Sequence, residues 1–157
     1  MKLSQALKEK KRLAAEIQHL KNRIMSKNSY IKQSNVKEKF NVVEMYDELQ
    51  RKVQELMNLK IVINEANKEI QSSIYALSEY KAMISFWNGV PVAEGMVERG
   101  YQDTLTEYEC QIDEVKKIEI VAELQKKADL LQDQIDTYNY TTEVAWGEDY
   151  SVEPDEK

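Results

Sequence analysis

Proline and glycine are scarce in this chain of 157 residues, which contains 2 prolines and 4 glycines. Average domains use both residues several times more often. The first glycine is Gly89 and the first proline is Pro91, so the preceding sequence contains neither helix breaker. This scarcity excludes sandwiches and barrels with Gly- and Pro-rich turns, and it excludes a Gly-rich phosphate-binding loop. Long helices are predicted instead.

Cysteine and histidine occur once each, as Cys110 and His19. A single cysteine forms no disulfide within the chain and leaves a zinc pair incomplete. His19 lies between apolar positions of a basic segment and is expected at the surface, and no HExxH, CxxC or phosphate-loop sequence is present. The carboxylates Glu107, Glu109 and Asp113 disfavour a Cys110 thiolate. We therefore predict that the protein is not an enzyme and has no catalytic residue, metal site or cofactor.

Long apolar runs are also missing. No stretch of about 18 apolar residues exists, and Met1 is followed by Lys-rich sequence, so neither secretion nor membrane spanning is predicted. A cytoplasmic protein without a membrane partner is expected. The net charge of −6 argues against nucleic acid as a partner.

The charge is distributed unevenly. Residues 1–40 carry a net charge of +8, and residues 41–157 carry −14. One interpretation is that a basic first helix packs along acidic later helices, in the same chain or a neighbour. The other is a cationic mouth for a phosphate-bearing ligand. Its basic and aromatic residues are Arg23, Lys27, Tyr30, Lys32, Lys37, Lys39 and Phe40. Residues 148–157 hold five acids and one lysine and are predicted to be a disordered acidic tail.

Apolar residues recur at alternating steps of three and four, which is coiled-coil spacing. This rhythm predicts helices at about 2–26, 41–87 and 120–140. The first stripe is Leu3, Ala6, Leu13, Ile17, Leu20 and Ile24. The second stripe is Val42, Tyr46, Leu49, Val53, Leu56, Lys60, Ile63, Asn67, Ile70, Ile74 and Leu77, and a second row of Met45, Leu59, Val62 and Ala66 widens it. Asn41, with Glu44 three residues later, is an N-cap signal for the second helix.

Residues 88–119 interrupt this rhythm with three of the four glycines, which predicts an irregular or β-hairpin arm. The fold class is therefore all-α. Three long amphipathic helices form a coiled-coil-like bundle, with the short arm before the last helix. Residues 1–147 are predicted to be a single helical domain, and further copies of the chain are expected to complete its core as a homo-oligomer.

Several segments resemble a family of small, mostly helical bacterial and phage proteins often labelled septicolysin. They are residues 121–129 (VAELQKKAD), Asp136, residues 139–143 (NYTTE), the opening residues 1–3 with 6–7, and Ile63, Asn64 and Asn67. The chain departs from the family at Tyr140, where a Trp is usual, and in a Lys-rich loop after the first helix. The resemblance implies a helical, oligomeric fold more than an activity, although the label implies a cytolysin.

Two amides interrupt the apolar pattern, Asn67 on the stripe and Asn64 beside it. Buried amides need partners, so they either control helix register or line a ligand pocket between helices. The ligand pocket requires other groups of the chain to converge with the amides, namely aromatic rings that stack on bases, a guanidinium that binds phosphate, and further polar side chains. These candidates are Trp87, Arg99, Tyr101, Tyr138, Asn139, Tyr140 and Thr142.

The predicted function is that of a non-enzymatic homo-oligomer that binds a small anionic ligand. By analogy it is similar to the oligomeric helical proteins with which phages sequester nucleotide immune signals. Its expected partners are further copies of the chain and a nucleotide-like small molecule. The alternative is a ligand-free structural or adaptor protein held by the same heptads, and a third is a pore-forming toxin, as the family label suggests.

Overall fold

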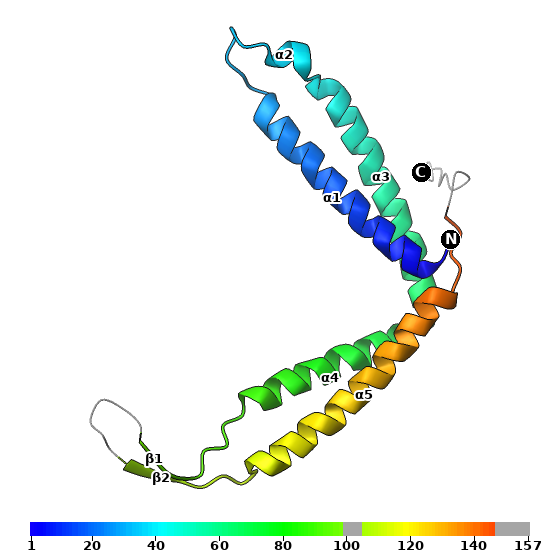
Figure 1. Ribbon diagram of the computed structural model, residues 1–157. Helices are drawn as coiled ribbons and strands as arrows, with labels where there is room; N and C mark the ends of the chain where they lie inside the picture. The colour runs from blue at the N-terminus through cyan, green and yellow to red at the C-terminus, as the bar shows by residue number, and fades with distance from the viewer. Residues whose placement is uncertain (99–104, 147–157) are drawn as a thin grey trace, which may run out of the picture. The chain divides into compact units, whose positions relative to one another are not determined.

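The computed structural model describes residues 1–98 and 105–146. The protein is mostly helical and has a two-stranded antiparallel hairpin before the last helix (Figure 1), which confirms the predicted fold class. The elements are α1 (Leu3–Lys27), α2 (Val36–Lys39), α3 (Val42–Asn67), α4 (Gln71–Gly89), β1 (Gly95–Glu98), β2 (Leu105–Tyr108) and α5 (Glu114–Thr141). They form two compact units. Among the described residues, the first contains residues 1–69 and 138–146, and the second contains residues 70–98 and 105–137.

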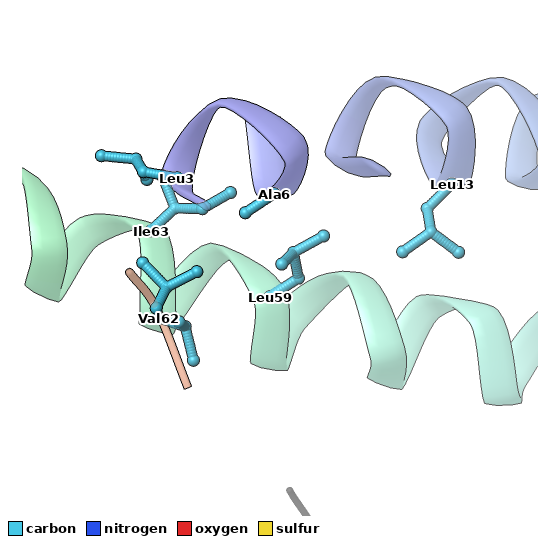
Figure 2. Close-up of a cluster of buried hydrophobic side chains, with 7 residues drawn as sticks. Leu3, Ala6, Leu13, Leu59, Val62 and Ile63 are labelled. Carbon is cyan, nitrogen blue, oxygen red and sulfur yellow. The ribbon is translucent and has the colours of Figure 1, made fainter. Parts of the chain in front are cut away.

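In the first unit α1 lies along α3 (Figure 1), and apolar side chains of the two helices meet between them (Figure 2). The buried cluster consists of Leu3, Ala6, Leu13, Leu59, Val62, Ile63 and Val144. The segment after α5 is fastened to the start of the chain. Leu3 N–H donates to the Thr142 carbonyl at 2.9 Å, and Val144 N–H donates to the Met1 carbonyl at 2.8 Å.

The stripe predicted for α1 is confirmed from Leu3 to Leu20, whose apolar members are buried. The stripe predicted for α3 is wrong at Tyr46 and Lys60, which are exposed. The residues that α3 buries are Leu59, Val62 and Ile63. An α-helix has 3.6 residues per turn, so a strict seven-residue repeat drifts around it by about 20° per heptad. The second apolar row therefore supplies much of the face toward α1.

The predicted continuous helix at 41–87 is also wrong, because a turn at residues 68–70 separates α3 from α4. Lys68 N–H bonds three residues back to the Glu65 carbonyl at 3.2 Å. Ile70 then adopts φ −104° and ψ 1°, outside the helical region, and Ser73 N–H donates to its carbonyl at 3.0 Å. No proline or glycine marks this turn. The single domain predicted for residues 1–147 stays a prediction, because the residue contacts within the chain define two compact units, each described by itself.

In the second unit α4 packs along α5. Leu77 of α4 and Ala128 and Ile135 of α5 form its buried cluster, and half-buried apolar residues surround them. α5 begins at Glu114 and not at about residue 120 as predicted, because the Asp113 carboxylate caps it. Asp113 Oδ1 accepts a hydrogen bond from Lys116 N–H at 2.8 Å, which satisfies one of the unpaired donors at a helix start.

The predicted arm is a hairpin in which β1 pairs antiparallel with β2, from Gly95 opposite Tyr108 to Glu98 opposite Leu105. Gly95 has φ 77°, a conformation that glycine adopts without steric cost. Lys117 of α5 holds the base of the arm. Its ammonium group donates to the carbonyls of Asn88 at 3.1 Å and Val90 at 2.8 Å. The acidic tail predicted for residues 148–157 lies outside the described residues.

Candidate ligand-binding site

Arg23 and Lys27 at the end of α1, together with Phe40 between α2 and α3, form what we call the cationic cluster. Arg23 Cζ lies 5.6 Å from the centroid of the Phe40 ring, and Lys27 Nζ lies 4.8 Å from it. Cations at this range are attracted to the ring quadrupole by about 0.5–1 kcal/mol at exposed sites. The ring of Phe40 thus contacts two cationic side chains, those of Arg23 and Lys27.

Phe40 lies between the end of α2 and the residue that caps α3. α2 ends at Lys39, Phe40 follows it in an extended conformation with φ −134°, and Asn41 then caps α3 as predicted. Asn41 Oδ1 accepts from Val43 N–H at 3.1 Å and from Glu44 N–H at 3.2 Å. Both bonds fix the first turn of α3, and Phe40 is the residue directly before this cap.

The two cations of the cluster have no acidic partner within the described residues. By contrast, Arg12 in the middle of α1 pairs with Glu9 and Glu16. Three further exposed lysines lie in the loop and in α2, between Lys27 and Phe40, and Glu38 is the only acid in this stretch. They are Lys32, Lys37 and Lys39. The turn therefore carries excess positive charge, which attracts anions.

A cavity of about 480 Å³ lies beside the cluster, between α1 and α3. It is lined by Ala15, Glu16, His19, Leu20, Arg23, Glu48 and Lys52. Lys52 Nζ donates to Glu16 Oε2 at 2.6 Å. This bond, helped by the charges of Lys52 and Arg12, holds the pKa of Glu16 below its usual value of 4.5. The positive charge of Lys52 is therefore balanced by the carboxylate of Glu16. Arg23 is the cation of this cavity that has no ion pair.

The ion pair between Lys52 and Glu16 bears on the predicted charge matching. It places the acid on α1 and the base on α3, which is opposite to the predicted direction. The pair between Lys2 and Glu143, at 2.9 Å, follows the predicted direction, from the basic start of the chain to an acidic later segment.

A second cavity, of about 390 Å³, lies at the base of the arm in the second unit. Its lining is mainly apolar and comprises Phe86, Trp87, Val90, Pro91, Ala93 and residues 108–112. The rings of Phe86 and Trp87 meet edge to face, with centroids 5.5 Å apart. Desolvation, followed by the charges of Glu94 and Asp113, raises the pKa of the Cys110 thiol. Acidic neighbours and apolar walls make this cavity a poor site for an anion.

The other predicted site residues are spread over the chain. Trp87 lines the arm cavity in the second unit, and Arg99 and Tyr101 lie outside the described residues. Tyr30, in the loop after α1, is 42% exposed. In the first unit Asn64 and Tyr140 are exposed, and the half-buried members are Asn67, Tyr138, Asn139 and Thr142.

The prediction of buried amides is wrong, because no polar or charged residue is buried in the part of the chain that the structure describes. Of the predicted set, the structure brings Arg23 and Lys27 together. Sequence reasoning missed Glu48 and Lys52 of the adjoining cavity. Their signal is a pair of charged residues, four positions apart, on the half-buried side of α3. His19 is exposed, as predicted.

Comparison with known protein families, with curated proteins and with solved structures finds no match to this chain. The resemblance to septicolysin-like proteins therefore stays a prediction. None of the helices in the described ranges has the length and apolarity needed to cross a bilayer. The described residues also contain no group of three potential metal-ligating side chains.

Proposed function

We propose that this protein is a non-enzymatic helical homo-oligomer that binds a small anionic ligand at the cationic cluster. The observation that supports this proposal is the pair of unpartnered cations, Arg23 and Lys27, held against the ring of Phe40. A guanidinium and an ammonium group bind phosphate oxygens through charge-assisted hydrogen bonds. The adjacent aromatic ring suits a ligand that also carries a base, because aromatic side chains stack on nucleobases. A nucleotide that is held without turnover is the proposed ligand class.

Exposed apolar side chains support self-assembly. In α4, Tyr75 is 62% exposed and Phe86 is 59% exposed, and in α5 Ile118 is 61% exposed. Only two of the nineteen residues of α4 are charged, and Leu77 is its only buried residue. A helix with so little charge favours burial on more than one side. Further copies of the chain would cover these side chains.

The ligand proposal is tested by calorimetry and native mass spectrometry with pyrophosphate, AMP and a cyclic dinucleotide as probes. We expect at least one probe to bind and to be recovered unchanged. The double variant Arg23→Gln/Lys27→Gln should weaken binding at least tenfold, because it removes both charge-assisted bonds. The control is Lys21→Gln, which removes an exposed charge of α1 outside the cluster. Equal affinity in the double variant would remove the cluster from the site, and no binding by any probe would overturn the ligand proposal.

The low charge of α4 also favours a second candidate, a structural or adaptor protein that has no ligand. Both candidates require an oligomer, but they differ in what native mass spectrometry finds bound to it. A stable oligomer that retains no small molecule and binds none of the probes would support the structural role.

A further inference from the structure

The cavity beside the cationic cluster contains an acid that has no partner among the described residues. Two carboxylates line this cavity, those of Glu16 and Glu48. Both oxygens of Glu16 are occupied, because Oε2 accepts a hydrogen bond from Lys52 Nζ and Oε1 accepts one from Arg12. Glu48 is half-buried and makes no hydrogen bond or ion pair within residues 1–98 and 105–146. Its two oxygens are therefore open acceptors in the wall of the cavity.

An unpaired cation lines the same cavity. Arg23 lies over the ring of Phe40, with Cζ 5.6 Å from the ring centroid, and makes no ion pair with Glu48. The ion pair between Lys52 and Glu16 aligns α3 with α1. From this pair Glu48 lies four residues along α3 and Arg23 seven residues along α1, both toward the turn, because the helices run in opposite directions (Figure 1). At 1.5 Å per residue, their backbone positions differ by about 4.5 Å along the helices.

A ligand that uses both groups needs an anionic part for the guanidinium and N–H donors for the carboxylate. An ionised carboxylate is only an acceptor, with two oxygens side by side. Among the nucleobases, guanine alone presents two adjacent N–H donors, at N1 and N2, on its base-pairing edge. Adenine and cytosine each present one amino donor beside a ring nitrogen acceptor, and uracil and thymine present one N–H between two carbonyls. The carboxylate therefore accepts two bonds from guanine, whereas an acceptor atom of any other base would face its lone pairs.

We propose that this cavity selects a guanine nucleotide, with the Glu48 carboxylate accepting hydrogen bonds from N1–H and the 2-amino group of the base. The phosphate group lies at Arg23 and Lys27, so the ligand spans the cavity and the cationic cluster. His19 also lines the cavity, and imidazole rings stack on bases. The volume of about 480 Å³ is within the range of small-molecule pockets, about 300–1,000 Å³. The proposal rests on the nucleotide binding proposed above and names the base.

A neutral donor suits Glu48 better than a cation does. Arg23 and Lys52 line the same cavity, so a positively charged ligand group would meet like charges there. The N–H groups of guanine are neutral, and hydrogen bonds to a charged acceptor are roughly twice as strong as those between neutral groups. A bound adenine would take water away from Glu48 without supplying two donors. An acceptor that loses water and stays unpaired costs free energy, which disfavours adenine.

The first test is calorimetry of the full-length protein with two pairs of ligands that differ only in the base. The pairs are GMP with AMP, and cyclic di-GMP with cyclic di-AMP. In each pair that binds, the guanine ligand should have a dissociation constant about tenfold lower or more. Equal affinities, or a preference for adenine, would overturn this inference and leave the proposed nucleotide binding intact. If none of the four binds, the inference is overturned, and the ligand proposal survives only if pyrophosphate binds.

The second test changes the acceptor. Glu48→Gln offers one acceptor and one N–H donor, which match xanthine, where an oxygen replaces the 2-amino group of guanine. This variant should bind GMP about tenfold more weakly or worse, and it should bind xanthosine monophosphate more tightly than GMP. The matched control is Glu55→Gln, at another half-buried glutamate of α3 that does not line the cavity, and it should leave both affinities unchanged. A Glu48→Gln variant that keeps the native preference for GMP would overturn the assignment of Glu48.

Discussion

The side chain of Tyr138 shows how one residue can have a structural role where a binding role was expected. Its hydroxyl group donates to the Ala66 carbonyl at 2.7 Å and lies 3.3 Å from Glu69 Oε2. Its ring packs on the buried cluster of the first unit. Carbonyl groups in the last turn of a helix have no partner within the helix, so the Tyr138 hydroxyl supplies one at the end of α3. Tyr138 therefore stabilises the fold in the structure.

We expect Tyr138→Phe to lower the free energy of unfolding by about 0.5–1.5 kcal/mol, because it removes the hydroxyl group and keeps the ring. Urea denaturation followed by circular dichroism measures this change. The control is Tyr140→Phe, at a tyrosine that is 64% exposed, and it should have no effect. Equal stability of the two variants would show that the bond to Ala66 contributes nothing.

At the level of elements, the start of α3 determines both local stability and the position of the cationic cluster. We expect Asn41→Ala to cost about 1 kcal/mol of stability, because two backbone N–H groups lose their acceptor. It should also weaken ligand binding, since Phe40 immediately precedes the cap. Thermal unfolding and calorimetry with pyrophosphate measure the two effects. Asn35→Ala is the control, because Asn35 precedes α2 without making a side-chain capping bond. Equal losses in both variants would contradict this assignment of the cap.

The elements also show where sequence patterns succeed. The stripe of α1 and the Asn41 cap were predictable, because each depends on residues within a few turns of one another. The exposure of Lys60 and the break at Ile70 were not. Residues on either side of the predicted stripe compete for the face toward α1, and the turn before α4 contains no proline or glycine to mark it.

At the level of the whole molecule, the buried cluster of the first unit joins segments that are far apart in the sequence. Leu3 and Leu59 are both fully buried, and Val144, which follows α5, packs with them. We expect Leu59→Ala to destabilise the protein by about 2–5 kcal/mol, through lost burial and the cavity it leaves. Leu130→Ala is the control, because Leu130 is 58% exposed. Chemical denaturation of both variants measures the difference, and a cost below 1 kcal/mol for Leu59→Ala would contradict the role of this cluster.

The candidate site was predictable only in part. The basic and aromatic residues near the end of α1 lie close together in the sequence. Their cluster could therefore be predicted from the local composition and from the turn predicted after the first helix. The pocket expected around Asn64 could not be predicted reliably, because it required residues from distant segments of the chain to converge. Asn64 and Tyr140 are exposed, while Trp87 belongs to the second unit.

The sequence by itself determined the helical class, the place of an arm before the last helix, and the start of α3. These features depend on local periodicity, glycine placement and capping, whose energies act over a few residues. Only the tertiary structure decided which side of α3 faces α1, where α3 ends, and which two cations share the ring of Phe40. Those outcomes depend on the packing of side chains from different segments, which no local pattern specifies.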